Sequence, residues 1–176
     1  TEDDTPHPIN LYGESKLAGE QEVLQKCPKS LIVRTSWLFS HVGHNFVKTI
    51  LTLAAEKETL KVVDDQIGTP TYTEDLASAV SALIKEESSW GIVNVTNEGV
   101  ASWYDLAFEI LQEAQRYGLP CKTRDIKPVP TAEFPTPAVR PAYSVLNKCR
   151  MRKHLTNPMP HWKESLRLAI EKYQSS

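Results

Sequence analysis

Glycine is scarce in this sequence. The chain of 176 residues contains seven glycines, and they never occur as G-x-G-x-x-G or G-x-x-G-x-x-G. Patterns of this kind form the turn that lets a backbone approach the pyrophosphate of a dinucleotide. The sequence as given therefore contains no recognisable dinucleotide-binding turn.

Cysteines, an excess of one charge and long apolar runs are also lacking. Cys27, Cys121 and Cys149 match neither a disulfide framework nor a zinc site, and the histidines show no metal-binding spacing, so we predict no metal. Twenty basic against 22 acidic residues give no electrostatic basis for binding nucleic acid or a membrane surface. No apolar run approaches the about 20 residues that span a bilayer, and no signal sequence is visible. We expect a cytoplasmic globular protein with reduced thiols.

Helices and strands are predicted to alternate along the chain. Apolar periodicity predicts helices at about 11–26, 46–58, 73–86, 103–117 and 160–173, with Asn10, Asn45 and Ser102 as N-caps. Short β-branched runs predict strands at 30–36, 60–63 and 91–95. Residues 120–144 contain six of the twelve prolines and are expected to be irregular. The alternation predicts an α/β architecture with parallel strands.

The residues with the clearest chemical meaning are Tyr12 and Lys16, on the first predicted helix. Four positions apart, they lie on one face of that helix, one turn from each other. A nearby ammonium favours the ionised form of a phenol, and such a phenol can exchange a proton with a carbonyl or alcohol oxygen. Tyr-x-x-x-Lys alone is a weak pattern, since most matches are ordinary surface pairs.

Several further segments strengthen that pattern because of their order and separation. They are Pro8–Glu20, Leu31–Phe39, Asn45–Lys48, Val63–Thr71 and Arg140–Leu146. Together they resemble the C-terminal part of the dTDP-4-dehydrorhamnose reductase family, which belongs to the extended short-chain dehydrogenases/reductases. The resemblance covers nearly the whole chain.

The resemblance implies a fold and a domain organisation. Residues 1–176 would form the C-terminal part of a Rossmann-type doubly wound sheet plus a small substrate-binding α/β lobe. The dinucleotide-binding N-terminal half, about 120 residues when compared with ordinary two-lobed domains, would be absent from this chain, together with the Ser or Thr that completes the catalytic set. The isolated chain is then expected to be inactive.

The resemblance also implies an activity and its residues. NADPH or NADH would reduce dTDP-4-dehydrorhamnose to dTDP-L-rhamnose, and a homodimer is a further option. Tyr12 would donate the proton to the 4-keto oxygen, while Lys16 would assist the phenol and hold the nicotinamide ribose. Trp37 would stack on the deoxysugar, or serve as a core or rim aromatic. Arg140 would grip the nucleotide diphosphate, or lock its loop through a salt bridge.

Three other positions are open to two interpretations. Gln66 to Thr71 carries a Gly/Pro turn that either frames the sugar-nucleotide site or leads into the next helix. Arg34, in a predicted strand, needs a carboxylate partner and is interpreted as structural. Glu74 falls where some relatives place a magnesium ligand, but Lys163 replaces the matching second acid, which argues against a metal.

The remaining tryptophans lie at the edges of predicted helices and strands, and we interpret them as core or rim aromatics. They are Trp90, Trp103 and Trp162.

Two rival functions remain open. The first is another sugar-nucleotide epimerase or dehydratase of the same superfamily. The second is a non-catalytic regulatory subunit like the β-subunit of methionine adenosyltransferase, which shares the Tyr-x-x-x-Lys pattern. The segments Arg34–Trp37 and Asp65–Thr71 favour the reductase over the first rival. The Thr-Ser-Trp match at 35–37, which the second rival lacks, favours it over that one.

Overall fold

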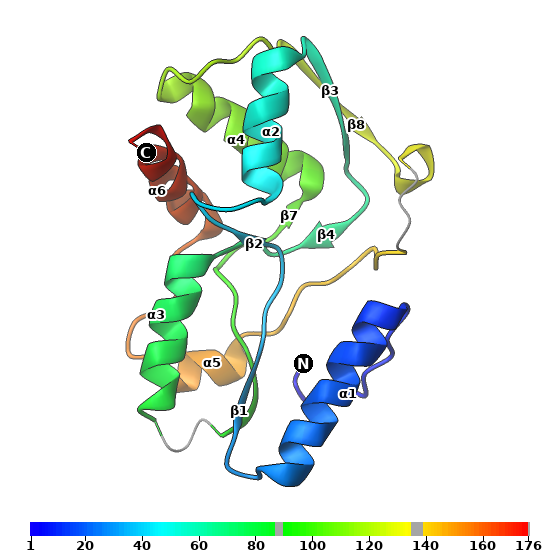
Figure 1. The fold of residues 1–176 in the computed structure, drawn as a ribbon, viewed down its shortest axis with the longest axis vertical. Coiled ribbons are helices and arrows are strands. Elements are labelled where there is room, and N and C mark those ends of the chain that lie inside the picture. The colour runs from blue at the N-terminus through cyan, green and yellow to red at the C-terminus, as the bar shows by residue number, and fades with distance from the viewer. Residues whose placement is uncertain (87–89, 135–138, 176) are drawn as a thin grey trace.

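The structure, a computed structural model, describes residues 1–86, 90–134 and 139–175. Figure 1 shows two lobes joined by short strands near the middle of the molecule. The upper lobe in that view contains α2 (Phe46–Glu56), β3 (Thr59–Val63), α4 (Trp103–Arg116), β8 (Asp125–Val129) and α6 (Trp162–Gln174). The lower lobe contains α1 (Leu11–Lys26), β1 (Leu31–Arg34), α3 (Thr73–Ile84), β6 (Gly91–Asn94) and α5 (Cys149–His154). The predicted α/β architecture is confirmed.

The strands pair mostly in parallel, as the alternation of helices and strands predicted. Strand β1 pairs with β6, and β3 pairs with β8, both in parallel. At the centre, β2 (Leu38–Phe39) pairs in parallel with β5 (Thr71–Tyr72). The exception among the described pairs is β4 (Ile67–Gly68), which runs antiparallel to β7 (Ala101–Ser102). These short central strands bring the chain segments between the lobes together.

Each lobe has its own apolar core. The upper core is built around Phe39, Tyr72 and Trp162, each only 1% exposed. The lower core contains Leu83 and Val93, both fully buried. A strand that is covered by helices loses its apolar surface to the core, which explains the continuous β-branched runs in the sequence.

The predicted N-caps are confirmed. The Asn10 side chain accepts a hydrogen bond from the Gly13 amide at 2.8 Å, which fixes the start of α1. Asn45 caps α2 in the same way, and Ser102 forms a reciprocal capping box with Asp105 at the start of α4. Because a cap satisfies amides that the helix itself leaves unpaired, these residues define where each helix begins.

The prediction of an irregular segment at 120–144 is wrong in its middle part. Residues Asp125–Val129 form β8, which pairs in parallel with all of β3, although Pro128 lies inside it. Among the described residues, β8 pairs with no other strand, so it is an edge strand, where the missing amide of a proline can face away from its neighbour. Residues 135–138 of the segment lie outside the described residues.

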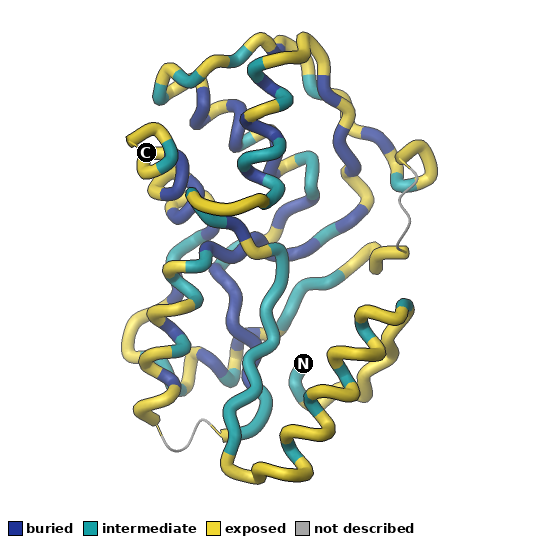
Figure 2. Tube along the Cα trace, in the orientation of Figure 1, coloured by how far each residue is buried: buried dark blue, intermediate teal, exposed yellow. Residues whose placement is uncertain are grey.

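Helix α1 lies against β1 on the side away from α3 and α5, and it is poorly covered (Figure 1). None of the residues Leu11–Lys26 is buried, and Figure 2 shows the helix as largely exposed. The side chains of Leu11 and Val23 are 79% and 45% exposed. Exposed apolar side chains on a helix indicate a surface that another part of a protein can cover.

The two lobes are joined by a buried polar network around Asn97. Its side-chain amide donates to Asp75 at 2.7 Å and to the Ser165 hydroxyl at 2.9 Å, and its oxygen accepts from the Tyr72 amide at 2.8 Å. Asn97 is fully buried, so its side chain loses its hydrogen bonds to water on folding, and these bonds replace them. The network fixes the starts of α3 and α6 relative to each other.

Candidate functional site

Tyr12 and Arg140 are brought together by a contact between distant parts of the chain. Tyr12 lies in the first turn of α1, two residues after the cap residue Asn10. The side-chain amide of Asn10 donates to the Val139 carbonyl at 2.9 Å. This bond ties the start of α1 to the segment that carries Arg140. Asn10 therefore both caps α1 and closes one end of the site.

A cavity of about 440 Å³ lies at this junction. Its walls include Tyr12, Ser36, Trp37, Gln66, Trp103 and Arg140. Three of the four residues that the sequence singled out, namely Tyr12, Trp37 and Arg140, thus border one cavity. Lys16 does not line it, but the Lys16 Nζ lies 5.3 Å from the centroid of the Tyr12 ring. Tyr12 is 72% exposed, so its phenol is open to the solvent beside the cavity.

Trp37 is held in an unusual backbone conformation at the end of β1. Its φ angle of 48° lies in the left-handed region, which bulky residues rarely adopt. The Trp37 indole stacks on Trp103, with ring centroids 3.6 Å apart and planes 7° from parallel. Such strain persists where the surroundings enforce it, typically at functional sites.

Gly68 packs directly against the Trp37 ring. A Cβ at Gly68 would lie within 2.7 Å of the Trp37 atoms Cζ2 and Nε1. Because Trp103 already stacks on one face of the Trp37 indole, a sugar can stack on that face only when Trp103 moves. Glycine at position 68 is the residue that allows the backbone this close to the indole.

A second cavity of about 510 Å³ lies next to the first. Its lining is mainly apolar and comes from α2 and β3, including Phe46, Ile50, Leu53 and Val62. Gln66, Trp103 and Arg140 line both cavities. The Arg140 Cζ lies 6.0 Å from the centroid of the Trp103 ring. A guanidinium and an indole therefore stand at the boundary between a chamber with an exposed phenol and an apolar chamber.

Arg34 has the structural role that the sequence predicted. Its guanidinium donates to both carboxylate oxygens of Glu20 on α1, with Nη2 2.6 Å from Oε2. Hydrogen bonding to Glu20 raises the pKa of Arg34, against the effect of burial. Bidentate pairs of this kind fix orientation as well as distance. The pair holds α1, and with it Tyr12, against β1.

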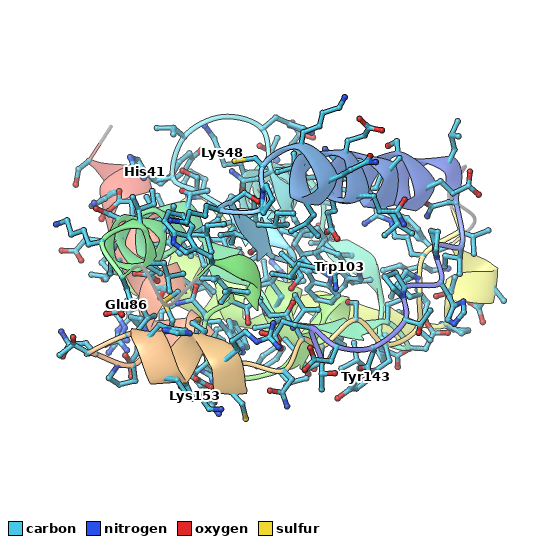
Figure 3. The ribbon with its side chains drawn as sticks, turned by 90° about the horizontal axis from the view of Figure 1, so that it is seen from below. His41, Lys48, Glu86, Trp103, Tyr143 and Lys153 are labelled. Carbon is cyan, nitrogen blue, oxygen red and sulfur yellow. The ribbon has the colours of Figure 1, made fainter. Side chains whose placement is uncertain are left out.

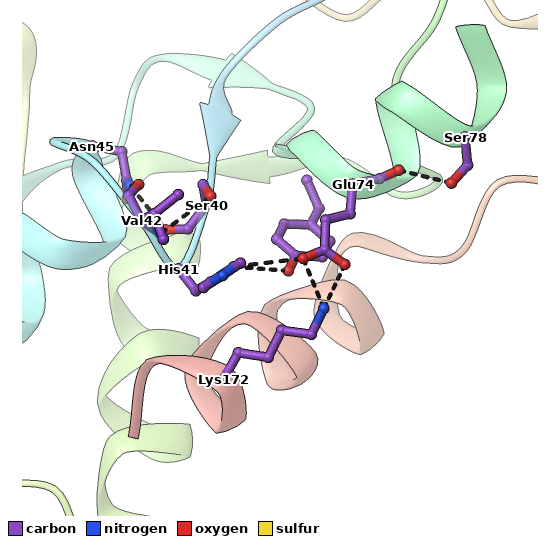
Figure 4. Close-up of polar contacts among 8 residues, drawn as sticks. Ser40, His41, Val42, Asn45, Glu74, Ser78 and Lys172 are labelled. Atoms are coloured by element: carbon purple, nitrogen blue, oxygen red, sulfur yellow. Dashed lines mark hydrogen bonds and ion pairs between the residues drawn. The ribbon is translucent and has the colours of Figure 1, made fainter. Parts of the chain in front are cut away.

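Glu74 is bound by side chains of this chain (Figure 4). Its carboxylate accepts from the Lys172 Nζ at 2.6 and 2.7 Å, and it lies 3.6 Å from the His41 Nδ1. Burial and the neighbouring Glu74 carboxylate raise the pKa of Tyr72, whose hydroxyl lies 3.2 Å from the same His41 nitrogen. The Lys172 ammonium thus binds both oxygens of the Glu74 carboxylate. Among the described residues, no group of three or more His, Cys, Asp or Glu side chains could hold a metal ion.

Trp103 is the residue of this site that sequence reasoning missed. The sequence suggested a core or rim aromatic, whereas the structure places Trp103 in the middle of the molecule (Figure 3) between two cavities. No local pattern identifies it. Its position follows from the β4–β7 pairing, which joins residues far apart in the sequence.

Parallel strands with helices on both sides, and an exposed tyrosine–lysine pair at the edge of a cavity, place the chain in the structural class of Rossmann-type reductases and epimerases. The chain belongs to the RmlD substrate binding domain family, whose sequence model matches residues 1–175. Among the described residues, no helix is both long and apolar enough to cross a membrane.

Curated relatives and solved structures agree with this assignment. The chain is 39% identical over 165 residues to the dTDP-4-dehydrorhamnose reductase of Escherichia coli, covering 92% of this chain and 55% of the relative. It is 42% identical over 175 residues to the spore coat polysaccharide biosynthesis protein SpsK of Bacillus subtilis, covering 99% and 59%. The crystal structure of dTDP-4-dehydrorhamnose reductase from Bacillus anthracis in complex with NADP superposes with a TM-score of 0.89 at 41% identity, covering 97% and 58%. The chain therefore spans a little over half the length of these proteins.

The fold alone does not distinguish the reductases from the other enzymes of their superfamily. The dTDP-glucose 4,6-dehydratase of Bacillus anthracis has a TM-score of 0.78 against this chain at only 15% identity. Shared architecture at that identity carries no information about the reaction.

Replacing Gly68 by alanine tests how tightly the aromatic pair is held. The added Cβ would overlap the Trp37 indole, and overpacking of this kind should lower the free energy of unfolding by about 1–3 kcal/mol. Gly19→Ala is the matched control, because a Cβ there meets nothing within 4 Å. In the middle of α1 it should stabilise by about 0.5–1 kcal/mol. Urea unfolding measures both, and equal effects of the two variants would contradict the packing.

Proposed function

We propose that the protein containing this chain reduces dTDP-4-dehydrorhamnose to dTDP-L-rhamnose with NADPH. The observation that carries the proposal is the placement of Tyr12, Trp37 and Arg140 around one cavity, next to a second, apolar cavity. Curated relatives at about 40% identity with this name support the choice of substrate. A member solved with NADP supports the choice of cofactor.

Tyr12 is the proton donor of the proposed reaction. Its phenol stands at the mouth of the cavity, where it can protonate an oxygen of a bound keto sugar. Lys16, which lies over the Tyr12 ring, provides the positive charge that favours the phenolate left behind. Reduction of a ketone needs a hydride and a proton together, and a bound NADPH supplies the hydride.

The two cavities suit the two halves of a sugar nucleotide. The sugar fits the chamber that Tyr12 borders, while the apolar chamber between α2 and β3 suits a nucleobase. Arg140 stands between them, where a diphosphate linking the two halves would lie. A planar guanidinium offers paired donors to phosphate oxygens. Trp37 forms part of the wall of the sugar chamber.

The residues of this chain can contact part of a nicotinamide cofactor, and the rest of the cofactor would be bound by another part of the protein. Lys16 and Tyr12 lie on the exposed side of α1, where the ribose of a nicotinamide nucleotide can reach them. We propose that a dinucleotide-binding part covers α1 and the edge of β1 that stays unpaired among the described strands. The cytoplasmic location and the homodimer remain predictions.

The rival functions are less well supported. An epimerase or dehydratase shares the fold at low identity, whereas the reductases are about 40% identical to this chain over the aligned residues. A regulatory subunit needs no cavity with an exposed phenol beside it. The arrangement of Tyr12 and Arg140 around such a cavity therefore favours an enzyme.

Substituting Tyr12 by phenylalanine in the full-length protein tests the proton donor. The variant keeps the ring and the helix, so kcat should fall by about 10²- to 10⁴-fold while the protein stays folded. Tyr117→Phe, the same change at the end of α4 and outside both cavities, is the matched control and should keep nearly full activity. Reductase activity of Tyr12→Phe within a few-fold of wild type would remove Tyr12 from the mechanism.

Calorimetry tests the division of the cofactor site. Titrating NADPH into the isolated 176-residue chain should give negligible heat, because no dinucleotide-binding turn is present in it. The full-length protein under the same conditions is the positive control. Clear saturable heat from the isolated chain would show that this part binds the cofactor unaided.

A further inference from the structure

The wall between the two cavities contains an indole whose orientation is fixed by a chain of hydrogen bonds. We propose that Trp103 contacts the sugar-nucleotide substrate and that Gln66 is the positioning residue that orients Trp103. This inference rests on the proposed function, since it assigns two residues to the same site.

Trp103 is placed where both halves of a substrate would meet it. Its ring lines both cavities, and only part of its surface is buried. One face stacks on Trp37 with ring centroids 3.6 Å apart, and Gly68 packs against the Trp37 ring. The second cavity begins beyond this stack, where Phe46 is tilted against Trp103 at 4.7 Å between ring centroids. Trp37 and Phe46 thus both contact the indole, and the rest of its surface borders the two cavities.

Gln66 fixes the rotation of the indole within the stack. The Trp103 Nε1 donates to the Gln66 Oε1 at 3.1 Å. An indole nitrogen can only donate, so the amide oxygen of Gln66 must face Trp103, and its nitrogen must face away. That nitrogen donates to the Thr131 hydroxyl at 2.9 Å. Gln66 is 6% exposed, which makes a rotated, mismatched amide costly.

Asp65 completes the chain and sets its direction. The Thr131 hydroxyl donates to the Asp65 carboxylate at 2.6 Å, and the Thr131 amide donates to it at 2.9 and 3.0 Å. These bonds lower the pKa of Asp65, so the carboxylate stays an acceptor near neutral pH. Because Asp65 only accepts, the Thr131 oxygen is left to accept from Gln66. Each bond in the chain therefore has one allowed polarity.

A comparison with Trp162 separates this arrangement from ordinary packing. Trp162 is 1% exposed in the upper core, and its Nε1 has no hydrogen-bond partner among the described residues. Trp162 thus shows what a tryptophan used for packing looks like in this chain. Trp103 differs in both respects, since it borders two cavities and its nitrogen is bonded to a buried amide.

The experiment uses the full-length protein with two disrupting variants, Gln66→Leu and Thr131→Val, and a conservative one, Thr131→Ser. Thr59→Val, at an exposed position of β3, is the matched control. Two closely stacked indoles give an exciton couplet in the far-ultraviolet circular dichroism spectrum, which reports the Trp37–Trp103 stack directly. Steady-state kinetics with the dTDP keto sugar and NADPH give kcat and KM separately.

Both disrupting variants should weaken the couplet and raise KM for the sugar nucleotide by about three- to tenfold, the effect of one lost hydrogen bond. Because Tyr12 is untouched, kcat should change by less than about twofold. Thr131→Ser should restore wild-type values, and Thr59→Val should show them throughout. Thr131→Val is nearly isosteric, so it remains informative if Gln66→Leu fails to fold.

A weakened couplet with unchanged KM would show that Trp103 only packs, and an unchanged couplet in both disrupting variants would show that Gln66 does not orient it. Either result overturns the proposal. If the wild-type protein does not turn over the dTDP keto sugar, the proposed function fails, and the substrate contact of Trp103 fails with it. The circular dichroism comparison would still decide whether Gln66 orients Trp103.

Discussion

The face-to-face stacking of Trp37 on Trp103 is the contact on which the geometry of the site depends. Trp37 follows β1 in the lower lobe, and Trp103 begins α4 in the upper lobe, so their contact joins the two lobes. Stacked aromatic pairs contribute about 0.5–1.5 kcal/mol beyond the area they bury. Here the pair also separates the two cavities, and any change in its position alters both chambers.

The short central strands make this contact available. In the antiparallel β4–β7 pair, Ile67 lies opposite Ser102, and the next position in that register brings Gln66 to Trp103. The segment that follows Arg140 is held by the same strand, because Ile67 exchanges backbone hydrogen bonds with Ala142 and Ser144. One two-residue strand thus positions the amide, the indole and the loop that carries the guanidinium.

Features that depend on neighbours in the sequence could be predicted, and features that depend on distant pairing could not. The caps at Asn10, Asn45 and Ser102 follow from local chemistry, and the sequence identified all three. The strand β8 was missed because Pro128 and the prolines around the strand indicate a loop, and its pairing with β3 overrides that local preference. The structure places Tyr12, Trp37 and Arg140 around one cavity. Their roles were predicted from a resemblance and stay predictions, since no spacing in the sequence joins residues so far apart. The resemblance did not point to Trp103, which the sequence analysis therefore interpreted as a packing aromatic.

Transfer of deuteride from NADPH labelled at the nicotinamide C4 tests the central claim most directly. The full-length protein would be incubated with the dTDP keto sugar and the labelled cofactor, and the product examined by mass spectrometry and NMR. A reductase that works as proposed leaves one deuterium on the sugar carbon that carried the ketone, and it consumes one NADPH for each product formed. A product without deuterium and a cofactor that is not consumed would instead indicate an epimerase or dehydratase, and would contradict the account.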